Sequence, residues 1–189
     1  MNYFKELIDL CQHITINDQK GRPLLIEKAF DRTVQMIMDH KNKGKVFLIG
    51  NGGSAAIASH TMTDFIRNAK IPAMAFNDAA LLTCMSNDYG YEKVYEKPIE
   101  VVVKRGDVLI AISSSGKSKN IIRAVRAAQK NKARVITLSG FNRNNYLSKL
   151  GEINFYVPSS SYGFVESIHF LICHCIVDTL IAKKKRKNG

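Results

Sequence analysis

The chain has 189 residues, of which 46% are hydrophobic and 23% charged, and this is enough for one domain with a sizeable core. No uncharged apolar run reaches the roughly 18 residues of a membrane span. The first residues also lack the basic-then-apolar pattern of a signal peptide. We therefore expect a cytoplasmic protein with no membrane partner.

Cationic side chains are in excess, and the formal net charge is +12. Five of the cations form a terminal basic tail, residues 183–189, which we expect to be frayed. No basic stripe interleaved with aromatic residues and no base-reading motif is present, which argues against nucleic acid as a partner. A small anionic substrate would be attracted by the same positive field.

The four cysteines lie in apolar periodic segments and do not have the spacing of a disulfide framework. Cys173, His174 and Cys175 are adjacent on a predicted helix, where neighbouring side chains point about 100° apart. They cannot converge on one metal ion, so we expect packed thiols.

Two helices are predicted ahead of the first strand. Apolar residues recur at helical spacing over residues 3–16 and 24–39, and residues 17–23 between them are typical of a loop. We expect this N-terminal helical pair, segment 1–44, to pack on the core or on a partner subunit, and the sequence leaves both options open.

Strands and helices alternate through the rest of the chain. Short apolar runs predict five buried strands, over residues 46–49, 71–76, 108–112, 135–138 and 153–157. Helices are predicted over residues 55–64, 79–86, 120–129 and 163–182, with residues 91–103 forming a helix broken at Pro98. This order predicts an α/β fold over 45–182: a doubly wound, mostly parallel five-stranded sheet with helices on both faces.

A glycine turn follows the first predicted strand. It consists of Gly50, Asn51, Gly52, Gly53 and Ser54, and Ser54 is a plausible N-cap for the helix that follows. Backbone N–H groups, the positive end of the helix dipole and side-chain-free glycines together make an anion site.

A serine loop follows the third predicted strand and precedes a helix. Small hydroxyls beside helix N–H groups suit a phosphate, and the loop supplies four of them: Ser113, Ser114, Ser115 and Ser118. Ligands of doubly wound sheets bind at the carboxyl ends of the strands, where both loops fall. The sequence therefore predicts one phosphate-binding site built from both loops.

Nucleotide-binding alternatives fit less well. The glycine pattern that precedes the lysine of a P-loop is missing, which argues against a nucleoside triphosphate. A dinucleotide fingerprint would require glycine where Ala55 stands and would use Asp78 as its acid, but it would leave the serine loop without a role. We expect no nucleotide cofactor.

Acids and histidines recur on two predicted helices. His60 and Asp64 are four residues apart and share a face, and the last helix carries Glu166, His169 and His174. A lone histidine is most often a packing or capping residue. Two such helices together favour a shared site for a divalent metal or for acid/base catalysis.

These motifs resemble the SIS (sugar isomerase) domain family and, within it, the bacterial phosphoheptose isomerases. The resemblance covers about residues 24–180 and rests on residues 50–60, 86–90, 106–118 and 168–174. It implies interconversion of sedoheptulose 7-phosphate and D-glycero-D-manno-heptose 7-phosphate for lipopolysaccharide or capsule heptose. It also implies a homotetramer with sites at subunit boundaries, often with zinc.

The resemblance also assigns roles to residues. It places sugar contacts at Asn51, Gly52, Gly53, Asn87 and Asp88, and the phosphate at the serine loop. It places metal-site histidines at His60 and His174.

Three departures from the family pattern affect catalysis. The family's catalytic glutamate is Asp64, whose shorter side chain moves the carboxylate by more than about 1 Å, enough to impair proton transfer. The family's glutamine on the last helix is Glu166, and the aspartate before it has no match because residues 162–166 are one residue shorter.

Two classes of function follow. In the first, the chain is an isomerase whose general base is Glu166 or Asp64, whose acid is His174, and whose possible zinc ligands are His60, Asp64, Glu166 and His174. In the second, it is a non-catalytic sugar-phosphate-binding or regulatory protein, similar to the members that bind the replication initiator. An isomerase of another phosphosugar is a further alternative.

Overall fold

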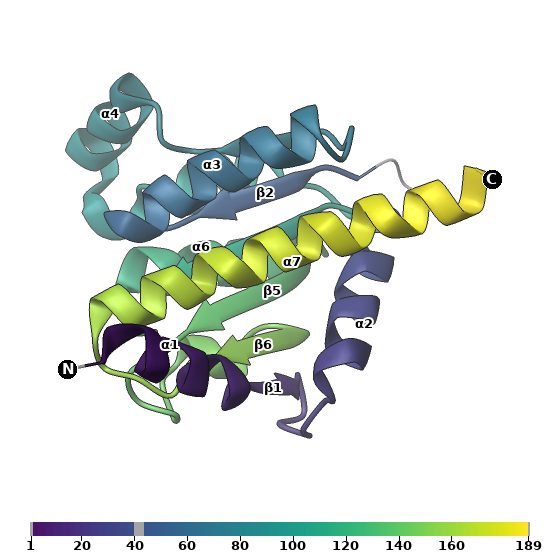
Figure 1. The fold of residues 1–189 in the computed structure, drawn as a ribbon. Coiled ribbons are helices and arrows are strands. Elements are labelled where there is room, and N and C mark those ends of the chain that lie inside the picture. Colours follow the sequence, from purple (N-terminus) through teal and green to yellow (C-terminus); the bar gives the residue numbers. More distant parts are fainter. Residues whose placement is uncertain (1, 40–43, 189) are drawn as a thin grey trace.

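The structure is a computed structural model that describes residues 2–39 and 44–188. A six-stranded sheet runs through its centre (Figure 1). The strand order is β1-β6-β5-β4-β2-β3, and only the β1–β6 pair is antiparallel. The strands are β1 (Thr15–Asp18), β2 (Val46–Ile49), β3 (Ala73–Ala75), β4 (Val108–Ser113), β5 (Arg134–Ser139) and β6 (Ile153–Tyr156). The predicted fold class, a mostly parallel doubly wound sheet, is confirmed.

The predicted number of strands was wrong because β1 was assigned to a helix and a loop. The first helix ends at Gln12, and the chain then adds an edge strand in which Ile16 pairs with Phe155 of β6. Ile16 is buried there. A run of four residues with alternating burial is too short to predict a strand from the local sequence. Pairing with β6 therefore determines that these residues form one.

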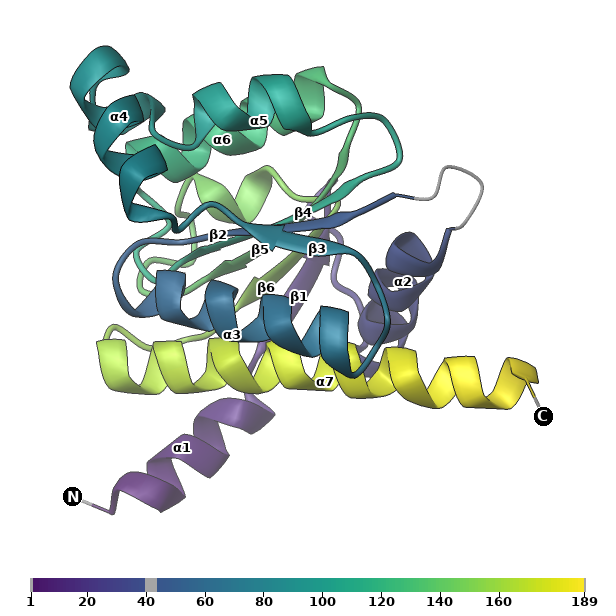
Figure 2. The same cartoon turned by 90° about the horizontal axis from the view of Figure 1, so that it is seen from above.

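Helices cover both faces of the sheet (Figure 2). On one face lie α3 (Gly53–Arg67), α7 (Tyr162–Asn188), α2 (Ile26–Met38) and, outside α7, α1 (Tyr3–Gln12). On the other lie α4 (Ala79–Tyr89), α5 (Glu96–Val102) and α6 (Lys119–Lys130), and 3-10 turns occupy Tyr91–Lys93 and Leu147–Lys149. The N-terminal helices therefore pack on the core of their own chain.

Successive side chains along the buried strands point to opposite faces of the sheet, so the hydrophobic core has two parts. In β2, Val46 and Leu48 face the core beneath α3 and α7, whereas Phe47 and Ile49 face the core beneath α5 and α6. All four side chains are buried, which explains the continuous apolar run in the sequence.

The strand order places the switch point of the sheet between β2 and β4. From β2 the chain moves outward to β3, then crosses back to β4 on the other side of β2 and continues outward to β5 and β6. The loops that leave β2 and β4 therefore lie side by side at the carboxyl ends of adjacent strands. This is the position at which doubly wound sheets bind ligands.

Two local predictions fail for identifiable reasons. Pro98 does not break a helix, because it lies in the first turn of α5, where its missing N–H is not needed. The basic tail is not frayed, because α7 continues to Asn188. Lys183 Nζ lies 2.7 Å from Asp31 Oδ1, and Lys184 Nζ donates to the carbonyl of Ala69 at 2.7 Å.

Helix α7 is long and apolar enough, by length and composition, to cross a membrane. Half of its most apolar window is buried inside the domain, where it packs against α2, α3 and α1. This is the environment of the core helix of a soluble domain. Of its two thiols, Cys173 is buried as expected and Cys175 is exposed.

Candidate active site

A pocket of about 330 Å³ opens at the switch point, between the loops that leave β2 and β4 and the start of α7. Nine of the residues predicted from the sequence line it, eight of them from the two loops: Asn51, Gly52, Gly53, Ser54, Ser113, Ser114, Ser115, Ser118 and Glu166. Ile112 and Tyr162 complete the lining. The structure thus brings the two predicted loops into one site.

The glycine turn presents the N-terminus of α3 to this pocket. Gly52, with φ of +54°, is the N-cap, so Ser54 lies inside the first turn and is not the cap that we predicted. Gly52 has the left-handed conformation that glycine adopts without strain. The buried hydroxyl of Tyr95 donates to the carbonyl of Gly50 at 2.5 Å, and burial raises the pKa of Tyr95 to about 12, so it remains a donor.

Asn51 ties the glycine turn to the start of α6. Its carboxamide forms a reciprocal pair with that of Asn120: Asn120 Nδ2 donates to Asn51 Oδ1 at 2.8 Å, and Asn51 Nδ2 donates back at 3.0 Å. The hydroxyl of Tyr91 also donates to Asn51 Oδ1 at 3.0 Å. The two loops of the pocket are therefore held together by side-chain hydrogen bonds.

The serine loop leaves hydroxyls available for an anion. Ser113 Oγ and Ser118 Oγ share a hydrogen bond of 3.3 Å, and Ser114 Oγ is buried with no hydrogen-bond partner among the described residues. Ser118 precedes α6 and makes no side-chain cap, so the first N–H groups of that helix are not capped by it. These hydroxyl and amide donors suit a phosphate group.

Glu166 projects from α7 against the first turn of α3. A β-carbon on Gly53 would collide with its carboxylate, with only 2.6 Å to Oε1. Because Gly53 has no side chain, the carboxylate of Glu166 lies close to the positive end of α3 and inside the pocket.

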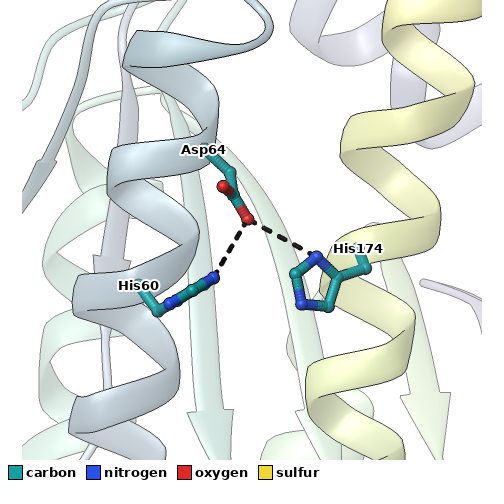
Figure 3. A group of neighbouring side chains, drawn as sticks. All are labelled: His60, Asp64 and His174. Carbon is teal, nitrogen blue, oxygen red and sulfur yellow. Dashed lines mark ion pairs between the residues drawn. The ribbon is translucent and has the colours of Figure 1, made fainter.

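A second cluster lies further along the same two helices (Figure 3). Asp64 Oδ2 is 3.4 Å from His60 Nε2 and 3.4 Å from His174 Nδ1, and Asn68 Nδ2 donates to the other carboxylate oxygen at 3.0 Å. We call His60, Asp64 and His174 the histidine–aspartate cluster.

The cluster and the pocket share one seam between α3 and α7. Gly53, His60 and Asp64 lie within about 40° of one another around α3. Across the seam, Gly53 meets Glu166 and Asp64 meets His174. Glu166 and His174 are eight residues apart, or about 12 Å along α7. The group of ligand atoms that lie close together contains His60, Asp64 and His174, so Glu166 as a metal ligand stays a prediction.

The histidine–aspartate cluster fits a divalent metal. Its three ligand atoms lie within 4.8 Å of one another. Two imidazoles and one carboxylate are a common donor set for catalytic zinc, which keeps a further position for water or substrate. Phe170 packs against both imidazole rings, with centroid distances of 4.9 Å to His60 and 4.4 Å to His174, and so restricts their orientation.

Three predicted residues lie elsewhere. Asn87 and Asp88 are exposed on α4, where Asn87 Nδ2 donates to Asp88 Oδ1 at 3.0 Å, and neither lines the pocket. His169 is fully buried, and burial lowers its pKa to about 4 although the Ser139 backbone nearby raises it slightly. His169 is therefore a neutral core residue.

Sequence reasoning missed the residues that position the site. Asn120 holds Asn51, Asn145 packs against Gly116 of the serine loop, and Tyr162 forms part of the wall. Asn120 lies two residues after Ser118, a polar residue buried at the start of a helix, and that signal was present in the sequence. The other two become visible only when distant segments meet.

Fold and site together define a class: a doubly wound α/β protein with an anion pocket at its switch point and an acid–imidazole cluster beside it. The SIS domain matches residues 2–140. A phosphoheptose isomerase of Shewanella denitrificans is 33% identical over 173 residues, 87% of each chain. The chain belongs to the SIS domain family.

Solved structures support the same relationship. The phosphoheptose isomerase of Neisseria gonorrhoeae is 31% identical, with a TM-score of 0.77 over 94% of this chain and 95% of that one. The phosphoheptose isomerase of Francisella tularensis is 28% identical, with a TM-score of 0.81 over 96% and 95%.

Proposed function

We propose that this protein is an aldose–ketose isomerase that converts sedoheptulose 7-phosphate into D-glycero-D-manno-heptose 7-phosphate. The observation that carries the proposal is the α3–α7 seam, with a phosphate pocket at one end and the histidine–aspartate cluster at the other. The names and the identity of the relatives support the same substrate.

The length of the seam orients the substrate. With the phosphate at the serine loop, the C1–C2 end of the sugar extends toward the cluster, whose His174 lies about 12 Å beyond Glu166 along α7. An extended seven-carbon chain with a terminal phosphate has a length of this order. Glu166 then faces the part of the chain near the phosphate and binds its hydroxyls.

This orientation favours Asp64 over Glu166 as the proton carrier. The Asp64 carboxylate removes a proton from C2 or C1 and returns it to the other carbon through an enediol. His174, 3.4 Å from that carboxylate, supplies and withdraws protons at the two oxygens. His60, Asp64 and His174 would hold zinc, which when bound polarises the carbonyl.

The test is incubation of the folded protein with sedoheptulose 7-phosphate, after chelation and again after zinc is added back. We expect an aldose product at least 100-fold above the rate without protein. Binding of the sugar without any product in either condition would contradict catalysis and support the alternative, a sugar-phosphate-binding or regulatory protein.

We also propose that the protein is a cytoplasmic homotetramer with sites shared between subunits. An apolar face of α1 supports association, because Phe4 and Ile8 lie one turn apart and are 76% and 61% exposed. Sedimentation velocity should give four times the mass of one chain. Phe4→Glu with Ile8→Glu should lower that mass, and a monomer in the unmodified protein would contradict the proposal.

A further inference from the structure

Tyr162, the first residue of α7, forms an aromatic part of the phosphate pocket that the proposed reaction does not use. Its side chain lines the pocket together with Ile112, whereas most of the remaining lining is polar. The residue is 61% exposed, so its ring is open to a ligand.

The ring of Tyr162 is held by Phe141. The two rings meet edge to face, with centroids 4.9 Å apart and planes at 73°. Phe141 has φ of +57°, an uncommon conformation for a bulky residue. Two hydrogen bonds keep it there: its N–H donates to the Ser159 carbonyl at 2.8 Å, and its carbonyl accepts from the Tyr156 hydroxyl at 2.9 Å.

A strained residue that is fixed at both backbone atoms and supports a pocket-lining ring indicates a functional role for that ring. Free phosphate needs only the donors of the serine loop and the glycine turn. A phosphorylated sugar also brings a carbon chain with apolar C–H faces, and aromatic side chains bury such surface at low entropic cost.

We propose that Tyr162 is a specificity-determining residue that selects phosphorylated sugars over inorganic phosphate, its ring packing against the carbons next to the phosphate. The inference about Tyr162 rests on the proposed function only because it assumes that the phosphate binds at the serine loop. It adds a contact to the substrate that requires no turnover.

Calorimetric binding of sedoheptulose 7-phosphate and of inorganic phosphate tests the proposal. In Tyr162→Ala the dissociation constant for the sugar phosphate should rise about tenfold, while that for inorganic phosphate changes by less than twofold. Tyr162→Phe should retain most of the sugar affinity because the ring remains.

Two further variants sharpen the test. Phe141→Gly keeps the left-handed backbone and removes the supporting ring, so it should weaken sugar binding in the same direction but by less. Tyr146→Ala, at an exposed tyrosine that does not line the pocket, is the matched control. All variants should show unchanged circular dichroism.

Equal weakening of both ligands in Tyr162→Ala, or no change in either, would overturn the proposal. Turnover of the unmodified protein is measured separately. If the unmodified protein shows no turnover but Tyr162→Ala loses its selectivity for the sugar phosphate, the proposed isomerase is contradicted and the role of Tyr162 is supported. If the unmodified protein turns over its substrate but Tyr162→Ala keeps its selectivity, the proposed isomerase is supported and the role of Tyr162 is contradicted.

Discussion

At the scale of single residues, position along the α3–α7 seam separates the carboxylates of Glu166 and Asp64. Glu166 lies against the first turn of α3, where a β-carbon on Gly53 would collide with its carboxylate. Asp64, one methylene shorter, ends between the two imidazoles of the cluster. In the proposed orientation of the substrate, position along the seam, rather than chemical type, determines which carboxylate meets which part of it.

This separation predicts different kinetic effects for two isosteric substitutions. Asp64→Asn should lower kcat by about 10² to 10⁴ with a small change in KM, because it removes the proposed proton carrier. Glu166→Gln should raise KM by about tenfold with a smaller change in kcat. Steady-state kinetics with sedoheptulose 7-phosphate gives both numbers.

Zinc binding provides an independent readout for the same two substitutions. Asp64→Asn should weaken zinc binding, and Glu166→Gln should leave it unchanged, as measured by competition with a chelating dye. Glu152→Gln, whose carboxylate pairs with Arg134 away from the site, serves as the control. A larger loss of kcat in Glu166→Gln than in Asp64→Asn would contradict the assignment.

At the scale of elements, the serine loop is shaped by a segment that follows β5. Gly116 has φ of +62°, and a β-carbon there would collide with the side chain of Asn145. Asn145 Nδ2 in turn donates to Ser139 Oγ at 3.1 Å and to the carbonyl of Asn142 at 2.8 Å. The loop conformation therefore depends on both the strand before it and the next strand of the sheet.

Two glycine substitutions separate strain from collision. Gly21 also has a positive φ, +76°, but a β-carbon at this position would have no other atom within 4 Å. Gly21→Ala should cost about 1 kcal/mol of unfolding free energy through backbone strain alone.

Gly116→Ala should cost about 2 to 4 kcal/mol, because strain and collision add. It should also weaken inorganic phosphate binding, which Gly21→Ala should leave intact. Urea denaturation and calorimetry measure the two effects. Equal costs for both variants would show that Asn145 moves aside and does not brace the loop.

At the scale of the whole molecule, the helix that carries Glu166 and His174 also closes one of the two cores. His169 lies on the buried side of α7 and is fully enclosed. Neither of its ring nitrogens has a hydrogen-bond partner of good geometry among the described residues. Protonation of this imidazole is therefore coupled to unfolding of the domain.

The coupling predicts a specific loss of stability in acid. The pKa of His169 falls from 6.5 to about 4 in the folded protein, so between these pH values the unfolded state binds more protons. The contribution of His169 to the free energy of unfolding should be constant above pH 6.5 and should decrease as the pH falls toward 4. The contribution of this one group is about 3 kcal/mol.

Urea unfolding between pH 7 and pH 4 measures this loss. His169→Leu replaces the imidazole by an apolar side chain. It should reduce the slope of the unfolding free energy against pH over that range, by an amount that corresponds to the uptake of up to one proton. His13→Leu, at an exposed histidine of the first helical segment, is the matched control. An identical slope in His169→Leu and the unmodified protein would contradict the assignment.

The sequence by itself determined the parallel core, the two polar loops and the family. Buried strands such as β2 and β4 read as continuous apolar runs because both of their faces are covered. The glycine and serine loops could be predicted because glycines favour a tight turn and small hydroxyls are typical of the start of a helix. Their agreement with the structure needs no knowledge of distant contacts.

Only the tertiary structure decided the remaining features. Thr15–Asp18 becomes a strand because β6 offers a free edge, and Lys183 becomes helical where it meets Asp31. The placement of Asp64 beside His174, of Glu166 beside Gly53 and of Tyr162 beside Phe141 depends on which segments far apart in the chain lie together. Periodicity fixes the face of a helix but not the neighbour that this face meets or the distance between two sites along it.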